Sequence, residues 1–265
     1  MIINGKKITT IVSDLDGTLL PRGDVALNPT LFDMIWQMKK KGVAFIAASG
    51  RQYYNMQKLF SPVVDEISYI CENGSLIAKN GIVLEQKIME HEKVIELLLD
   101  MKAYSGTNQL VSSAEVGFID ETEQEFGDHI RNVVGNRVEV LTSFEELTAP
   151  AIKASVFWKG GIPKAAEDAM HEKYDAFFSV VDGGNGWLDF TAKGANKGNA
   201  LRFLSEKEHF LLEETICIGD SENDMSMLEI AGESYAMHTA REHVKQAADF
   251  VCKDALQLFE KILSV

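Results

Sequence analysis

The feature that most constrains the fold is a pair of short apolar runs, each ending in a cluster of acidic residues. The first run, Ile8 to Ser13 (ITTIVS), leads directly into Asp14-Leu15-Asp16-Gly17-Thr18-Leu19. The second, Thr215 to Ile218 (TICI), leads into Gly219-Asp220-Ser221-Glu222-Asn223-Asp224. Apolar runs of this length, rich in β-branched residues, predict buried strands. Ligands of α/β proteins bind just past the carboxyl ends of parallel strands, so both clusters are candidate site residues.

The segments that follow these runs predict a parallel sheet. Asn28-Pro29 is typical of a helix start, and Gly42, after three lysines, is typical of a helix end. Val43 to Ala48 predicts the next buried strand, and a strand, helix and strand in this spacing form a βαβ unit. The C-terminal third repeats the pattern: helix 196–204, strand 215–218, helix 223–231, strand 234–237 and helices 241–248 and 255–263.

The middle of the chain has a different pattern, in which strand runs separated by helices predict an α+β insertion with an antiparallel sheet. The expected strands are 82–85, 109–112, 117–120, 137–141, 153–158, 177–181 and 187–191, with a strong turn at 182–186. Joints are expected near Lys79-Asn80-Gly81 and Ala192-Lys193-Gly194. The fold class is therefore α/β: a Rossmann-like core of residues 1–81 and 192–265, with a parallel sheet flanked by helices, and an inserted domain over 82–191.

Composition excludes several classes of function. The formal net charge of −14 disfavours nucleic acid, which needs a basic face. No window approaches the ~18 apolar residues of a membrane span, and no targeting segment is evident, so we expect a soluble cytoplasmic protein. The three cysteines, Cys71, Cys217 and Cys252, fit buried reduced thiols, and His238 and His243 are expected at the surface without a metal.

Four segments carry residues suited to phosphate chemistry. Asp14 and Asp16 alternate along a strand-like segment, so both carboxylates can face one pocket, although an acidic turn is the simpler reading of this pair alone. Ser49-Gly50 offers a hydroxyl and a backbone amide to phosphate oxygens. Lys197, at a predicted helix start, can supply a fixed positive charge.

The acid cluster at Asp220 to Asp224 suits a hard cation, because Mg²⁺ prefers oxygen ligands from carboxylates, waters and phosphates. Helix capping by Ser221 is the alternative explanation of this cluster. Capping alone does not explain why a second acid cluster follows another buried strand.

Together these segments resemble the four motifs of the haloacid dehalogenase superfamily of phosphotransferases, over nearly the whole chain. The form GDSENDMSML, together with Glu72-Asn73-Gly74 after the third strand, looks like the Cof-type branch, subfamily IIB. The long insertion between Arg51 and Lys197 corresponds to the second (C2) cap type, a cap domain that would cover the site and choose the substrate.

The resemblance implies a Mg²⁺-dependent phosphatase that acts on phosphomonoesters of small metabolites, such as sugar phosphates. Asp14 would be the nucleophile that forms an aspartyl phosphate, and Asp16 the general acid and base, oriented by Thr18. The remaining implied residues form two sets. The metal set is Asp14, Asp16 (through its carbonyl), Asp220 and Asp224, with Asp224 either a ligand or a support; the phosphate set is Leu15 (amide), Ser49, Gly50 (amide), Lys197 and Asn223.

Substrate specificity and the exact reaction remain open at this point. Candidate specificity residues are Arg22, Asn73 and the segment Asp182–Asp189 with Trp187, each of which equally fits a structural role. A phosphohexomutase of the same superfamily and a non-catalytic sugar-phosphate-binding regulator are the alternatives. The partner is expected to be a small phosphorylated metabolite, and the sequence does not indicate an oligomeric state.

Overall fold

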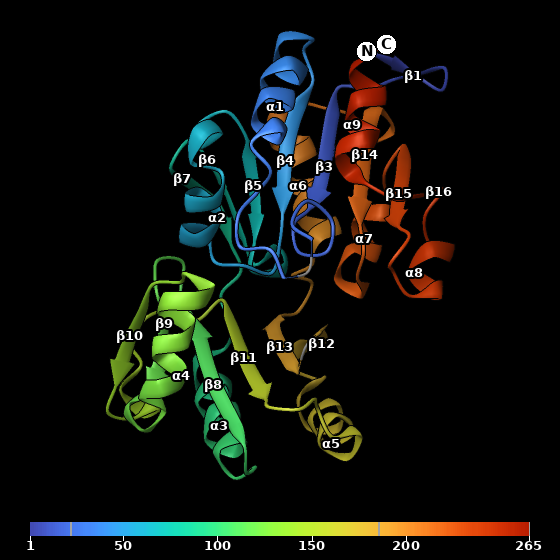
Figure 1. Cartoon of the computed structure of the whole chain (residues 1–265). Helices are drawn as coiled ribbons and strands as arrows, with labels where there is room; N and C mark the ends of the chain where they lie inside the picture. Colours follow the sequence, from blue (N-terminus) through green and yellow to red (C-terminus); the bar gives the residue numbers. More distant parts are fainter. Residues whose placement is uncertain (22, 185, 265) are drawn as a thin grey trace. The chain divides into compact units, whose positions relative to one another are not determined.

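The computed structural model of the chain describes residues 1–21, 23–184 and 186–264 (Figure 1). The chain divides into two compact units. The first comprises 1–49, 56–84 and 196–265, and the second comprises 50–55 and 85–195. The insertion boundaries expected from the sequence, 82 and 191, stay a prediction.

The first unit is built on an eight-stranded sheet with the order β16-β15-β14-β3-β4-β5-β6-β7. Its strands are β3 (Thr10–Asp14), β4 (Ala44–Ala48), β5 (Ser68–Cys71), β6 (Leu76–Lys79), β7 (Ile82–Gln86), β14 (Thr215–Gly219), β15 (Glu233–Met237) and β16 (Phe250–Cys252). The pairs from β16 through β5 are parallel, and β6 is antiparallel to β5. A separate ribbon pairs β1 (Ile2–Ile3) with β2 (Lys6–Lys7). The expected parallel sheet is thus confirmed.

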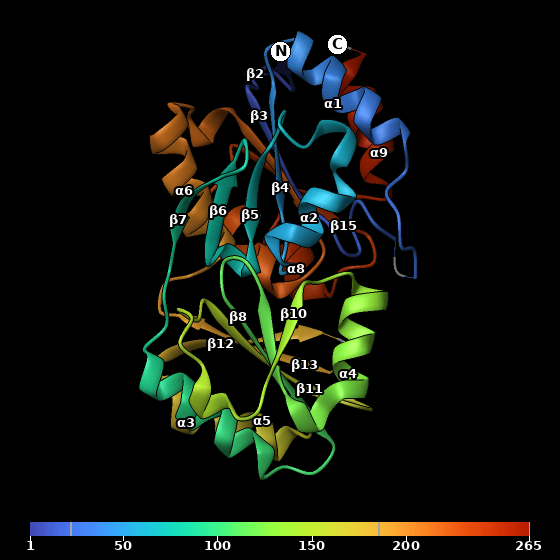
Figure 2. The same ribbon diagram turned by 90° about the vertical axis from the view of Figure 1, so that its left-hand side faces the viewer.

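Helices cover both faces of this sheet, as Figure 2 shows for α1, α2 and α9 on one side and α6 on the other. The helices are α1 (Thr30–Lys40), α2 (Tyr53–Leu59), α6 (Lys197–Glu208), α7 (Met225–Leu228), α8 (Glu242–Gln246) and α9 (Ala255–Leu263); single turns of 3₁₀ helix are Ser61–Val63, Glu72–Gly74, Leu212–Glu214 and Glu222–Asp224. Helix α1 places Leu31, Met34, Ile35 and Met38 in the core, as its apolar periodicity requires.

The second unit contains a six-stranded sheet with the order β10-β9-β8-β11-β13-β12. Its strands are β8 (Thr107–Ser112), β9 (Gly117–Asp120), β10 (Val138–Leu141), β11 (Lys153–Trp158), β12 (Phe178–Gly184) and β13 (Trp187–Ala192). Its helices are α3 (His91–Lys102), α4 (Gln124–His129) and α5 (Lys164–Tyr174), with 3₁₀ turns at Glu121–Glu123 and Phe144–Glu146 and a π-helical turn at Ile130–Val134.

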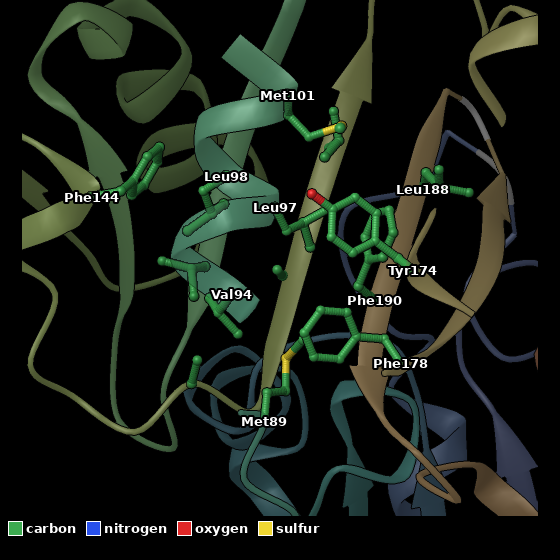
Figure 3. Close-up of a cluster of buried hydrophobic side chains, with 14 of the residues drawn as sticks. Met89, Val94, Leu97, Leu98, Met101, Phe144, Tyr174, Phe178, Leu188 and Phe190 are labelled. Atoms are coloured by element: carbon green, nitrogen blue, oxygen red, sulfur yellow. The ribbon is translucent and has the colours of Figure 1, made fainter. Parts of the chain in front are cut away.

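One face of this sheet packs against α3 and α5 to form the unit's core. Figure 3 shows side chains of α3, among them Leu97 and Met101, facing Leu188 and Phe190 of β13 and Tyr174 at the end of α5. This core explains the alternation of β11, whose apolar residues Ala154 and Val156 are fully buried in it.

Two expectations about the strands were wrong. Ile82–Gln86 lies at the edge of the eight-stranded sheet and not in the sheet of the insertion. Asn80 and Gly81, which link β6 to β7, have φ of 52° and 75°, so Asn-Gly makes a two-residue hairpin turn there. The sheet of the insertion is also not wholly antiparallel, because β9 and β10 run parallel.

Other features agree with the sequence analysis. The three cysteines are free and buried, and His238 and His243 are exposed. Among the helices that the structure describes, none has the length and apolar character needed to cross a membrane.

Candidate active site

The carboxyl ends of three adjacent parallel strands supply the first part of the site. Asp14 is the last residue of β3, Ser49 follows β4, and Asp220 follows β14. Because β3 lies between β14 and β4, these three residues meet at one edge of the sheet. All three are buried, with Asp14 and Asp220 each 4% exposed.

Three carboxylates converge here. Asp14, Asp220 and Asp224 each place a carboxylate oxygen within 4.8 Å of the others. The Oδ2 atom of Asp14 is buried and has no hydrogen-bond partner among the described residues. A buried acceptor that lacks a donor, beside two further carboxylates, fits a hard cation, since Mg²⁺ binds through oxygen ligands. The residues present therefore suit Mg²⁺.

Lys197 neutralises part of this negative charge. It is the first residue of α6 and is fully buried, and its Nζ donates to Asp14 Oδ1 at 2.7 Å and to Asp224 Oδ1 at 2.6 Å. Asn196 caps the helix by accepting a hydrogen bond from the Asn199 amide. This cap fixes where the helix begins and therefore where Lys197 lies. The structure thus brings together residues separated by 183 positions in the sequence.

Asp224 is occupied by protein donors. Its Oδ1 accepts from Lys197, while its Oδ2 accepts from the backbone amides of Asp220 and Ser221, each at 2.9 Å. Ser221 and Asp224 form the two halves of a capping box, so the capping explanation of this segment holds as well. These contacts join Asp224 to Lys197 and to the backbone of Asp220 and Ser221.

Burial and charge shift the ionisation of these groups. Burial raises the pKa of Asp14 well above its ordinary value, and the carboxylates of Asp224 and Asp220 raise it further, against the opposing effect of Lys197. Burial disfavours the charged form of Lys197, yet the carboxylates of Asp14 and Asp224 hold its pKa above the ordinary value. Lys197 is therefore a permanent cation, and a second positive charge would favour ionised Asp14.

The segment after Asp14 is a tight turn. Gly17 has φ of 92°, and a Cβ atom there would lie 2.2 Å from Asp220 Oδ2, so only glycine fits. Asp16 is exposed, and its carboxylate is not part of the cluster of three. The Thr18 hydroxyl is buried without a hydrogen-bond partner among the residues described, so the structure does not join it to Asp16.

Three of the expected phosphate-binding residues, Leu15, Ser49 and Asn223, lie in the segments that follow β3, β4 and β14. Ser49 is buried, its amide donates to the Ile70 carbonyl at 2.8 Å, and its carbonyl accepts from the Asn73 amide at 3.1 Å. The Leu15 carbonyl accepts hydrogen bonds within the tight turn. Asn223 lies in the 3₁₀ turn Glu222–Asp224, and its Nδ2 donates to Asn73 Oδ1 at 2.9 Å.

The expected specificity residues have mixed outcomes. Arg22 lies outside the described residues. Trp187 packs against the rings of Phe126 and Phe157, with centroid distances of 5.9 and 5.1 Å, which corresponds to the structural alternative. Asp189 is buried and accepts a hydrogen bond from Ser155 Oγ at 2.6 Å.

Lys153, in the second unit, is a buried cation that the sequence analysis did not single out. This buried lysine of β11 donates from Nζ to the Gly50 carbonyl at 2.7 Å and lies 3.9 Å from Asp189 Oδ2. A lysine at the start of a largely apolar strand was the available signal, since lysines are almost never buried without a partner.

Comparison with known proteins agrees with this geometry. The profile of the haloacid dehalogenase-like hydrolases matches residues 11–257. The chain belongs to this family. The predicted resemblance and enzyme class, a phosphoric monoester hydrolase of this superfamily, are confirmed. Its α/β fold with an inserted cap of the subclass II type is confirmed as well.

Similar proteins include several phosphatases. The chain is 28% identical to the 5-amino-6-(5-phospho-D-ribitylamino)uracil phosphatase YbjI of Escherichia coli, over 92% of this chain and 90% of that protein. It is 24% identical to the pyridoxal phosphate phosphatase YbhA of the same organism, over 92% and 93%. The solved structure of the subclass IIB sugar phosphatase BT4131 superimposes with a TM-score of 0.80 and 23% identity, over 96% and 97% of the two chains.

Proposed function

We propose that this haloacid dehalogenase-like hydrolase is a Mg²⁺-dependent phosphatase of small phosphorylated metabolites that works through an aspartyl phosphate on Asp14. The observation that carries the proposal is the environment of the Asp14 carboxylate. Lys197 holds its Oδ1, while its Oδ2 is buried without a partner among the described residues. One oxygen is thus fixed by a cation and the other is left for a ligand or a reacting phosphorus.

Asp14 would act as the nucleophile. Its carboxylate oxygen attacks the phosphorus of the phosphomonoester, the bond to the leaving alkoxide breaks, and an acyl phosphate forms on Asp14. Water then attacks that phosphorus and releases inorganic phosphate. Splitting one displacement into two lowers the barrier of each step.

Asp16 would move the proton. Its side chain is exposed and lies two residues after Asp14, directly before Gly17. From there it would protonate the leaving oxygen and then deprotonate the attacking water. Lys197, whose pKa the surrounding carboxylates keep high, would stabilise the negative charge of the phosphoryl group at this buried site.

Asp14 and Asp220 would be the carboxylate ligands of Mg²⁺, with the Asp16 carbonyl as a further oxygen. Bound there, the ion supplies positive charge for the phosphoryl oxygens. Asp224 would serve as a support, because its two oxygens are engaged by Lys197 and by backbone amides. Ser49, the amides of Leu15 and Gly50, Lys197 and Asn223 would hold the transferring phosphate.

The substrate class is proposed from the relatives. Because one relative acts on a ribitylamino-uracil phosphate, another on pyridoxal phosphate and a structural neighbour on sugar phosphates, the panel should contain all three kinds of compound. Phosphate release would be measured with Mg²⁺ and with EDTA, for the wild type and Asp14→Asn. The proposal expects turnover that requires both the metal and Asp14.

Two results would count against the proposal. Turnover that persists in Asp14→Asn would exclude this nucleophile. Binding without release on the whole panel would favour a regulator, whereas transfer of phosphate between two positions of a hexose, primed by a hexose bisphosphate, would favour a mutase.

A further inference from the structure

The turn Glu72–Gly74, which follows β5, has an unusual backbone. Its three residues have φ of 48°, 57° and 93°, and all three are buried. Left-handed backbone costs about 1–2 kcal/mol for a residue with a Cβ atom, and such strain persists only where the surroundings impose it. The position of this turn in the fold indicates what imposes it.

The turn contacts three of the four segments of the candidate site. The Asn73 amide donates to the Ser49 carbonyl at 3.1 Å, and Asn73 Oδ1 accepts from Asn223 Nδ2 at 2.9 Å. Gly74 lies so close to Asn196 that an added Cβ atom would be 2.3 Å from the Asn196 carbonyl oxygen. Asn196 in turn caps the helix that begins with Lys197.

The bond between the two asparagines fixes one side-chain amide. The Asn223 amide nitrogen carries two N–H donors, of which Asn73 takes one. Turning the Asn223 amide over would bring its Oδ1 against Asn73 Oδ1, two acceptors without a proton between them. In this orientation the second N–H of Asn223, a half-buried residue, would be available to a phosphate oxygen, while its Oδ1 is buried without a hydrogen-bond partner among the described residues.

We propose that Asn73 is a positioning residue, which orients the Asn223 amide toward the phosphate and holds the Ser49 loop beside it. This inference rests on the proposed function, in which Asn223 and Ser49 bind the phosphoryl group. It replaces the expectation that Asn73 selects the substrate: Asn73 acts through Asn223 and has the same effect whatever the leaving group.

The test is a double-mutant cycle between Asn73→Gly and Asn223→Ala. Glycine accepts the left-handed backbone, so Asn73→Gly removes the acceptor without adding strain. The readouts are the Kd of inorganic phosphate in the presence of Mg²⁺, by calorimetry, and kcat/KM for p-nitrophenyl phosphate. Each single variant is expected to lose about tenfold in both, the size of one hydrogen bond to a charged group. The double variant is expected to lose at most about twofold more than Asn223→Ala.

Two further variants separate this role from a structural one. Asn80→Gly makes the same substitution at φ of 52° in the exposed turn between β6 and β7, and should leave both readouts unchanged. Asn73→Asp keeps the acceptor oxygen, so Asn223→Ala should cost as much in that background as in the wild type. This second cycle decides the question even where Asn73→Gly does not fold.

The outcomes are distinguishable from failure of the proposed function. The inference is overturned if the losses of the two single variants in Kd and kcat/KM multiply in the double variant, or if Asn73→Gly behaves as the wild type. The proposed phosphatase function is unaffected by either result. A wild type that binds inorganic phosphate without hydrolysing esters overturns the proposed function, and the cycle in Kd still decides the role of Asn73. A wild type that binds no inorganic phosphate overturns the inference.

Discussion

Replacing Lys197 by methionine tests whether this lysine neutralises the buried acids. Its Nζ lies 2.7 Å from Asp14 Oδ1 and 2.6 Å from Asp224 Oδ1, and the side chain is fully buried. Lys197→Met preserves most of the side-chain volume and removes the charge. Removing one partner of a buried ion pair costs about 3–5 kcal/mol, because the remaining charge has no compensation. For a chain of this size that corresponds to a decrease in Tm of about 6–20 °C.

The assay is thermal unfolding in EDTA at neutral pH, followed by circular dichroism and repeated with excess Mg²⁺. Mg²⁺ binding at about 100 times its Kd adds about 2.7 kcal/mol of stability. We expect Mg²⁺ to raise the Tm of the variant more than that of the wild type, since the variant has no other positive charge at Asp14. Under saturating Mg²⁺ and substrate, kcat is expected to fall by about 10²–10³.

Lys79→Met is the matched control. Its Nζ is 2.6 Å from Glu208 Oε2, but the lysine side chain is 37% exposed. An exposed pair contributes at most about 1 kcal/mol. If Lys197→Met lowers the Tm in EDTA by no more than Lys79→Met does, the argument that the site depends on this buried charge is refuted.

Three further predictions follow from burial and close approach. Gly17→Ala would place a Cβ atom 2.2 Å from Asp220 Oδ2, so kcat/KM is expected to fall by about 10²-fold with weaker Mg²⁺ affinity; unchanged kinetics would contradict this. Asp14→Asn removes a buried carboxyl whose pKa is raised and which the folded wild type must ionise near pH 8. In EDTA at that pH the variant should therefore be more stable than the wild type by about 0.5–2 kcal/mol, seen as a higher Tm, although activity is lost. Burial raises the pKa of Glu123 to about 7, so the wild type should lose stability as pH rises from about 4.5 through 7, where the folded state must ionise this carboxyl. The expected loss in the wild type is about 1–2 kcal/mol after allowance for partial exposure. Glu123→Gln should not show it. Tm values of both proteins near pH 5 and pH 8 would test this.

Much of the first unit could be predicted because apolar runs mark buried strands directly. The run that precedes Asp14 and the run that precedes Asp220 became β3 and β14, neighbours in the sheet. Local patterns could not show which sheet a strand joins. Asn80-Gly81 suits both a joint and a hairpin turn, and only the pairing of β7 with β6 shows that it closes a hairpin of the eight-stranded sheet.

The site residues were named from motif order, while their contacts depend on tertiary structure. Nothing in the segment around Asp224 reveals that Lys197 occupies one of its carboxylate oxygens and two backbone amides the other. The link from Asn73 to Asn223 joins residues 150 positions apart and has no local signature. The roles of individual site residues therefore stay predictions until they are tested in solution.

The most direct test of the central claim is to trap the phosphoenzyme. Asp16→Ala would be mixed with p-nitrophenyl phosphate and Mg²⁺, quenched in acid and digested for mass spectrometry. Because this ester has a good leaving group, the acyl phosphate should form without a general acid and persist without a general base. The account predicts one added phosphoryl group on Asp14, absent in EDTA. Turnover of the wild type with no trapped phosphoryl group in Asp16→Ala, or with the group on another residue, would contradict it.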